Sequence, residues 1–307
     1  MSKHIQGDAY QRSELRDGMP TNTHTGGRAT MTTRARTSKP VLMFFVLVFV
    51  LSVPFWLLGA FTDLSKNIPI NLPIAALMLV NPMIAALILV YRENGSDGVK
   101  QLLKRPFDYQ RIKRKIWYVP IFFLMPLLMV VAYGLMKFMG VALPDLHFPG
   151  VMVPVFFVVF FIAGIGEELG WSGYAIDPMQ NRWGALTASI ILGVVWQIWH
   201  IVPDIQNHQT PLWIVWHRGG SVLLRVLIAW LYNNTGKSIF AVITFHAMVN
   251  IGQLVWPFYG SYYDPFIPFI LLAVTAAIVT FLWGPKTLAR YRYARLSGSD
   301  VKLSKSG

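Results

Sequence analysis

Eight long apolar stretches constrain this chain more than any other feature of its sequence. They lie at about residues 41–60, 72–91, 116–136, 151–176, 184–202, 211–232, 238–256 and 266–284. A helix needs about 20 mostly apolar residues to cross the hydrocarbon layer of a bilayer, and a soluble protein seldom carries eight such runs. Only 13% of the 307 residues are charged, about half the share that is usual in a soluble domain. The sequence therefore predicts an all-α, polytopic membrane protein with about eight transmembrane helices.

The basic residues indicate how these helices are oriented. Of the 27 Lys and Arg residues, seven lie in residues 1–40, eight in 92–115 and six in 285–307, whereas the intervening loops near 61–71, 137–150, 203–210 and 257–265 hold only Lys66 and Lys137. Loops rich in Lys and Arg stay in the cytoplasm, so we expect both termini there. We also expect the membrane to be a bacterial cell membrane. The net charge of +13 then reflects orientation and attraction to anionic lipid. Its placement argues against nucleic-acid binding.

The remaining segments are tails. Residues 1–40 are polar and rich in Thr, Arg and Gly, which predicts a disordered cytoplasmic N-terminal tail. This tail lacks the apolar core of a signal peptide. We expect residues 41–284 to form a helical membrane domain and residues 285–307 a basic cytoplasmic C-terminal tail. The chain has no cysteine, so it holds neither a disulfide framework nor a thiolate metal site.

Ionisable side chains inside the apolar stretches are the candidates for function, because charge is costly within a membrane. The segment "GEELGWSGY" carries Glu167 and Glu168, "WQIWH" carries His200, and "FHAMVN" carries His246 and Asn250. A lone His or Asn in a span is often a packing residue, and a lone Glu often belongs to a transporter. Together these groups supply a general base and donors for an oxyanion. The set suits hydrolysis of an amide bond by activated water.

Straight helices would separate these groups along the membrane normal. At about 1.5 Å per residue, His200 would lie near the outer face and Glu167 nearer the cytoplasm. They meet if residues 178–187 lie at the interface, if the next helix starts near Ala188 and if Pro203 breaks that helix inside the protein. We then expect a water-filled cavity that opens to the cytoplasm. A separation above about 10 Å between the Glu167 carboxylate and the His200 ring would exclude joint catalysis.

These segments resemble the three motifs of the CPBP family of intramembrane proteases, which includes the type II CAAX prenyl proteases and the bacteriocin-processing or immunity proteins. The motifs read "EELGWS", "WQIWH" and "HAMVN", and the similarity covers a catalytic region of about residues 151–255. The resemblance implies an intramembrane endopeptidase in which Glu167 and His200 activate the attacking water. It further implies that His246 and Asn250 stabilise the oxyanion and that Glu168 supports the site. The implied substrate is a peptide or protein, prenylated or associated with the lipid bilayer.

The resemblance leaves the question of a metal open. The family was long described as metal-dependent, and a metal-dependent site would use Glu167, His200 and His246 to hold zinc. The usual zinc-protease pattern, two His four residues apart with a Glu between them, is absent from this sequence. We therefore favour a site with no cofactor.

Ser172 is the one departure from the family pattern, because the first motif of the family ends in arginine. Without that cation, Glu168 lacks a positive partner one helical turn away. Another cation replaces it, for which Arg218 and Arg225 are the candidates, or the site works with an altered proton affinity. In a third interpretation the chain is a catalytically degenerate relative that acts as a membrane immunity or scaffold protein. A transporter is disfavoured because the sequence has no inverted repeat.

Overall fold

The structure of the protein is a computed structural model that describes residues 38–61, 74–143, 145, 150–255, 257, 264–289 and 291. Within these residues the regular elements are all helical and no strand is found. The all-α fold predicted from the sequence is therefore confirmed. The predicted N-terminal tail, except for its last residues, and most of the predicted C-terminal tail lie outside the described residues.

Within the described part of the chain, seven helical segments are long and apolar enough to cross a membrane, by length and composition. This confirms a polytopic membrane protein. The long helices are α2 (Ser38–Phe61), α3 (Asn81–Lys104), α4 (Tyr118–Phe138), α5 (Met152–Gly170), α7 (Ala185–Gln206), α8 (Pro211–Asn234) and α10 (Phe266–Trp283). Short helical turns accompany them: η2 (Ile74–Val80), η3 (Arg105–Phe107), η4 (Tyr109–Arg111) and η5 (Lys115–Trp117).

The seventh apolar stretch, predicted at residues 238–256, forms a shorter helix than the others. It consists of α9 (Ile239–Asn250), which continues as a single π-helical turn, η7 (Ile251–Val255). Almost all side chains of α9 are buried, and the helix packs against α4, α5 and α8. A helix surrounded by protein in this way need not match the thickness of the bilayer, which accounts for its length.

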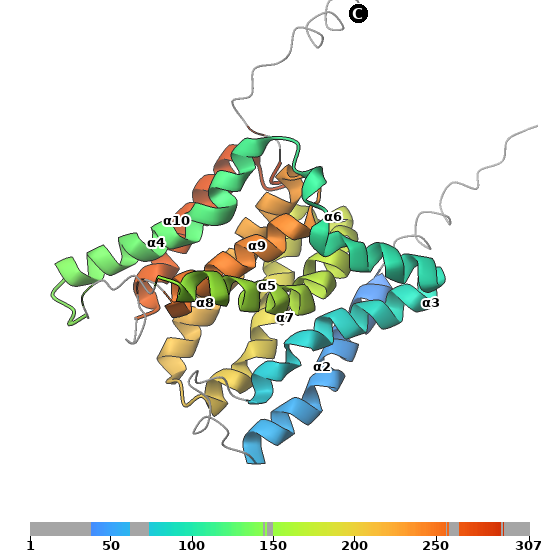
Figure 1. The fold of residues 1–307 in the computed structure, drawn as a ribbon, viewed down its shortest axis with the longest axis horizontal. Helices are drawn as coiled ribbons and strands as arrows, with labels where there is room; N and C mark the ends of the chain where they lie inside the picture. The colour runs from blue at the N-terminus through green and yellow to red at the C-terminus, as the bar shows by residue number, and fades with distance from the viewer. Residues whose placement is uncertain are drawn as a thin grey trace, which may run out of the picture.

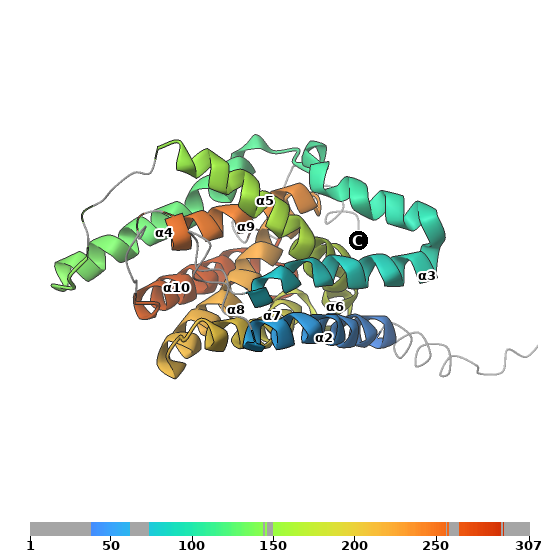
Figure 2. The same cartoon turned by 60° about the horizontal axis from the view of Figure 1, so that its bottom comes forward.

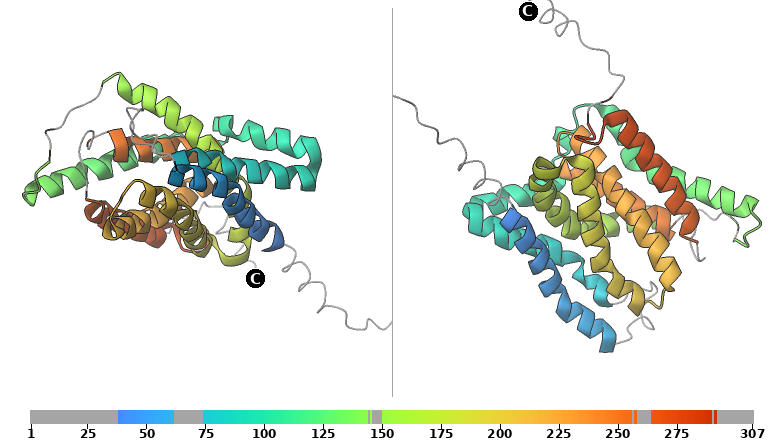
Figure 3. Two further views of the ribbon diagram at one scale, coloured as in Figure 1. Left: turned by 90° about the horizontal axis from the view of Figure 1, so that it is seen from below. Right: turned by 180° about the vertical axis from the view of Figure 1, so that it is seen from behind.

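The helices are arranged so that the motif-bearing segments lie in the middle of the bundle. Figure 1 shows α5, α7 and α9 centrally, with α2 and α3 on one side and α4 and α10 on the other. The rotated view in Figure 2 keeps this order. From behind, α8 lies between α7 and α10 (Figure 3, right), and it contacts both. The motif-bearing helices are thus surrounded by others, and the side chains of Glu167, Glu168 and His246 are buried.

The helix that carries the two carboxylates continues beyond them, as the apolar pattern predicts. A π-helical turn, η6 (Trp171–Ala175), joins α5 to α6 (Ile176–Trp183), and the combined segment has 32 residues. Gly184 then ends it with a φ of 79°, a left-handed conformation that glycine adopts at no steric cost. The next helix accordingly starts at Ala185 and not near Ala188.

The prediction that Pro203 breaks this next helix inside the protein is wrong, because α7 continues to Gln206. Proline removes one backbone donor from a helix. Here it lies in the last turn, where the loss of one hydrogen bond does not stop the helix. The carbonyl of Pro203 still accepts a hydrogen bond from the backbone N–H of Asn207, at 2.9 Å.

Gly170 permits the close contact between α5 and α3 that fixes the position of the carboxylates. A Cβ atom at this residue would lie 2.4 Å from the backbone oxygen of Pro82, and backbone cannot move aside as a side chain can. We expect Gly170→Ala to destabilise the fold by about 3 kcal/mol, the upper part of the usual range for overpacking. Thermal unfolding in detergent measures the loss. Gly134→Ala on α4 is the matched control, since a Cβ there has no neighbour within 4 Å, and an equal loss in both variants would contradict the expectation.

Candidate active site

Side chains from α5, α7 and α9 converge on Glu167. Its Oε2 lies 3.9 Å from Nε2 of His200, and its Oε1 lies 4.0 Å from Nε2 of His246. This separation is well inside the 10 Å limit set from the sequence. The three groups expected to act together are therefore neighbours in space, although they are far apart in the chain.

Trp196 holds the Glu167 carboxylate in place. Its indole N–H donates to Oε2 of Glu167 at 2.7 Å. The Trp196 ring also meets the rings of His200 and His246 edge-on, with centroids 5.3 Å and 5.6 Å away. One aromatic side chain thus orients the carboxylate and separates the two imidazoles.

The backbone fixes which nitrogen of His200 faces the site. Its Nδ1 lies 2.9 Å from the carbonyl oxygen of Trp196, one turn earlier on α7. A carbonyl only accepts, so Nδ1 carries the hydrogen and the neutral ring presents the lone pair of Nε2 toward Glu167. His200 retains 19% of its side-chain exposure, against 10% for Glu167 and 7% for His246. The site is therefore most accessible on the His200 side.

Glu168 points to a different set of partners from Glu167, although the two are adjacent in the chain. Neighbouring residues on a helix project about 100° apart. Oε1 of Glu168 lies 2.9 Å from Nδ1 of His246, so it accepts the Nδ1–H and leaves Nε2 of that ring directed toward Glu167. Glu168 is completely buried. Its position is that of a group that orients His246, and it does not line the accessible part of the site.

The cation that the first motif lacks comes from α8. Arg225 donates to both oxygens of Glu168, at 2.8 Å and 3.1 Å. The Ser172 hydroxyl donates to the same carboxylate at 2.5 Å. Arg218, the second candidate, is engaged elsewhere: it donates to Asp204 and Gln197. Of the two candidates, Arg225 is therefore the cation that pairs with Glu168.

Asn250 lies at the end of α9, one turn after His246, and is half-buried. The π-helical turn η7 begins directly after it, and η6 begins three residues after Glu168. Single π turns inside helices often occur at functional sites. Both motifs thus end at a place where the regular helix is interrupted, a feature that apolar periodicity does not reveal.

The donor types needed by zinc are present, but their arrangement does not fit the ion. Zinc ligands at about 2.0 Å in a tetrahedron lie about 3.3 Å apart, whereas the Glu167 carboxylate oxygens lie 3.9 Å and 4.0 Å from the nearest nitrogens of His200 and His246. Glu167 Oε2 also accepts the Trp196 N–H. Among the described residues no group of three His, Asp or Glu side chains is placed to hold a metal ion.

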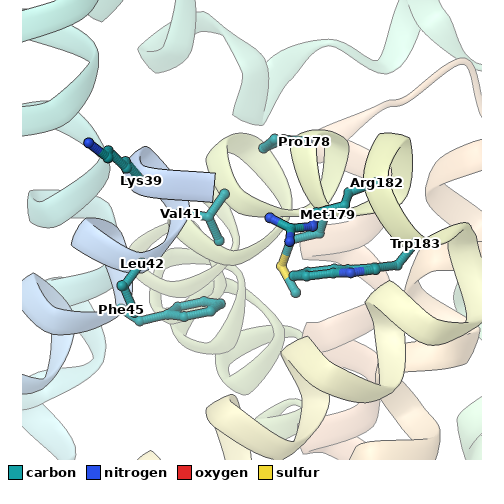
Figure 4. A pocket seen from close by; sticks show the side chains of 8 residues that line it. All are labelled: Lys39, Val41, Leu42, Phe45, Pro178, Met179, Arg182 and Trp183. Atoms are coloured by element: carbon teal, nitrogen blue, oxygen red, sulfur yellow. The ribbon is translucent and has the colours of Figure 1, made fainter. Parts of the chain in front are cut away.

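A cavity of about 330 Å³ lies apart from these groups, between the start of α2 and α6 (Figure 4). The lining residues are mostly apolar, with two cations: Lys39, Val41, Leu42, Phe45, Pro178, Met179, Arg182 and Trp183. No carboxylate or imidazole is among them. A second cavity, of about 720 Å³, is lined by residues of α3, η3 and η4 and one neighbour. Neither is the expected water-filled cavity around the carboxylates, which stays a prediction.

Comparison with known proteins places the matching region on the same residues. The Type II CAAX prenyl endopeptidase Rce1-like family matches residues 149–252, which include all three motifs. The chain is also similar to the CAAX prenyl protease 2 of Methanococcus maripaludis. The two are 29% identical over an alignment of 227 residues. The match covers 69% of this chain and 83% of the relative.

Proposed function

We propose that this chain, which belongs to the CPBP family of intramembrane proteases, hydrolyses a peptide bond with water that Glu167 and His200 activate. The observation that supports this most is the spacing of three groups around Glu167, at 3.9 Å from His200 and 4.0 Å from His246. Polar atoms about 4 Å apart are too far for a direct hydrogen bond but can share one bridging water. The substrate is a peptide or protein, and a lipid bilayer surrounds the helices.

The first step is attack of the water on the carbonyl carbon. The water donates one hydrogen to Glu167 and is oriented by the lone pair of His200 Nε2. As the new C–O bond forms, Glu167 accepts the one proton that the water loses, while Nε2 of His200 accepts a hydrogen bond from the hydrogen that stays on the attacking oxygen. The Trp196 N–H keeps Oε2 of Glu167 aligned throughout, and a base held in this way needs no reorganisation at the moment of reaction.

The second step is collapse of the tetrahedral intermediate. His246 and Asn250 donate to the oxyanion in this proposal. The Nδ1–H of His246 is directed to Glu168, so Nε2 can donate only if the ring carries both protons. Two carboxylates, the Arg225 guanidinium and an imidazolium then sum to zero charge. The C–N bond breaks when the proton held on Glu167 passes to the leaving nitrogen, and this returns Glu167 to its starting state.

The substrate class is proposed from the matched relatives. The relative's name specifies a prenylated substrate, and we propose a prenylated, membrane-associated peptide for this chain. An unprenylated peptide or bacteriocin precursor is the alternative. A purified sample in lipid nanodiscs, given a farnesylated CAAX peptide and its unmodified twin, separates the two by the cleavage products seen in mass spectrometry. We expect cleavage of the farnesylated peptide only, and preferential cleavage of the twin would contradict this assignment.

The same assay tests whether a metal takes part. The donor geometry supports hydrolysis by Glu167 and His200 alone, so we expect the rate to stay within about twofold when a strong chelator is added, because no step loses its general base. The complementary measurement adds zinc to the sample that contains the chelator. A rate that falls to background with the chelator and returns with zinc would contradict the metal-free mechanism.

A catalytically degenerate immunity or scaffold protein is the alternative function. It would be favoured if Glu168 were left without a cation, because its charge would then be uncompensated in a buried position. The pairing with Arg225 supports the protease instead. Retention of full biological activity in both Glu167→Ala and His246→Ala would favour the scaffold.

We further propose that both termini lie in the cytoplasm of a bacterial cell, on the basis of the Lys and Arg asymmetry of the loops. The absence of cysteine makes the test simple. A single cysteine placed at Lys113 should react only from the cytoplasmic side and one placed at Lys137 only from outside, and the reverse pattern would overturn this orientation.

A further inference from the structure

We infer that Arg225 is a positioning residue for the proposed hydrolysis: acting from α8, it fixes both carboxylates and, through Glu168, the ring of His246. The inference rests on the proposed function, because it assigns a role within the same site. It concerns a residue that lies outside the three sequence motifs, on a helix that contributes no motif of its own.

The contacts of Arg225 join two sides of the site. The side chain is fully buried, and two of its nitrogens meet the two oxygens of Glu168 at 2.8 Å and 3.1 Å. This forked pairing fixes the plane of a carboxylate as well as its charge. The Ser172 hydroxyl is 3.2 Å from the same guanidinium and completes the group.

The same guanidinium supports the second carboxylate indirectly. Its central carbon lies 4.1 Å from the centroid of the Trp196 ring, and the N–H of that ring donates to Glu167. A cation on an aromatic face holds the ring in position. Arg225 thus acts on Glu168 by direct contact and on Glu167 through Trp196.

The backbone of α7 leaves space for the Arg225 side chain. Gly193 on α7 faces Arg225, and a Cβ atom there would lie 3.2 Å from the Arg225 Cβ and from the Val222 Cα. The absence of a side chain lets α8 approach α7 closely. This approach brings the start of the Arg225 side chain near enough for its guanidinium to reach Glu168 on α5.

The consequence for His246 follows from the shared oxygen. Oε1 of Glu168 receives an N–H from Arg225 and the Nδ1–H of His246. If Arg225 is removed, Glu168 is a buried carboxylate with no cation fixed beside it. Such a group rotates or takes up a proton, and His246 then loses the acceptor that directs its Nε2 toward Glu167. The chemical step should be affected more than substrate binding, because His246 is proposed to act on the reacting atoms.

Ser172 provides the decisive test, because it lies one helical turn after Glu168, where a side chain on the same helix also reaches that carboxylate. We compare Arg225→Ser, Ser172→Arg and the double variant in the nanodisc assay, with Glu167→Gln as the inactive reference. Loss of a group that orients a reacting residue typically costs about 10- to 100-fold. We therefore expect such a fall in kcat for Arg225→Ser, with KM nearly unchanged. Ser172→Arg alone should also be impaired, since it adds a second guanidinium to a filled space.

The double variant should recover most of the activity lost in Arg225→Ser, because the cation then reaches Glu168 from α5. Arg225→Lys should be intermediate, as it keeps the charge and loses the fork. Arg218→Ser is the matched control: it breaks another ion pair on α8, with Asp204, and should lower stability while kcat per folded molecule stays near that of the wild type. If Arg225→Ser does not fold, Arg225→Lys and the double variant carry the test.

The outcomes separate this inference from the proposed function. Full activity of Arg225→Ser, with Glu167→Gln inactive, would overturn the positioning role and leave the proposed hydrolysis standing. A folded double variant that is no more active than Arg225→Ser would also overturn it. Full activity of Glu167→Gln would instead remove the proposed function itself.

Discussion

Glu167→Gln is expected to lower kcat by about 10³- to 10⁴-fold, the upper part of the range for a general base. The amide keeps the size of the side chain and can still accept the Trp196 N–H, but it cannot take a proton from water. Stability should change little, because the arrangement of Glu168 and Arg225 does not depend on this charge. The rate of peptide cleavage by purified protein, together with a thermal-unfolding curve, measures both quantities.

Glu93→Gln is the matched control for this substitution. Glu93 on α3 is an exposed carboxylate that accepts a hydrogen bond from the Tyr174 hydroxyl at 2.7 Å, and an amide oxygen can accept the same bond. It should leave kcat unchanged. Equal rates for wild type and Glu167→Gln would remove Glu167 from the mechanism, whatever the behaviour of the control.

His200→Asn should produce the second largest effect, a fall in kcat of about 10²- to 10³-fold. The shorter amide can still donate to the Trp196 carbonyl from near the position of Nδ1, but it offers nothing where Nε2 faces Glu167. The variant therefore removes the orientation of the water while it preserves the local backbone contact. Steady-state kinetics on the same peptide distinguish this loss in kcat from a change in KM.

His208→Asn controls for the chemical change. His208 is exposed and has a φ of 56°, a conformation that Asn accepts readily. The activity of the His208→Asn variant should match that of the wild type. An active His200→Asn would mean that Glu167 orients and deprotonates the water without help from His200, and the pairing of Glu167 with His200 would then have no catalytic role.

Much of this site could be predicted from the sequence because membrane helices leave few places for charge. Apolar runs of bilayer length locate the helices. The few ionisable residues inside these runs are then easily identified as candidates for function: Glu167, Glu168, His200 and His246. Their convergence was predicted from chemistry and from the resemblance to a family. The structure adds the distances, and the separate directions of the two adjacent carboxylates agree with the helical period.

Other parts of the site depend on contacts between residues far apart in the chain. The hydrogen bond from Trp196 to Glu167 has a weak signal in the sequence, since Trp196 lies one turn before His200 on the same face. Arg225, and not Arg218, meets Glu168, because Arg225 is completely buried two turns further along α8 whereas Arg218 is held by Asp204. The pairing of Arg218 with Asp204 has no local pattern at all.

The predicted helix boundaries were wrong where the position of a residue within its helix mattered more than its local helix-breaking tendency. Pro203 predicts a break, but a proline in the last turn removes too little to end α7 earlier. Gly184 marks the real boundary between α6 and α7, through its positive φ. The length of α9 also departs from the bilayer rule, because its neighbours are other helices and not lipid.

The most direct test of the central claim, that this chain cleaves peptide bonds with Glu167 as the base, does not require the substrate to be known. The N- and C-termini of membrane proteins are compared by mass spectrometry in cells that express the wild type or Glu167→Gln at equal levels. We expect a set of new termini that are present with the wild type and absent with the variant. Identical termini in the two samples, with both proteins folded in the membrane, would contradict it.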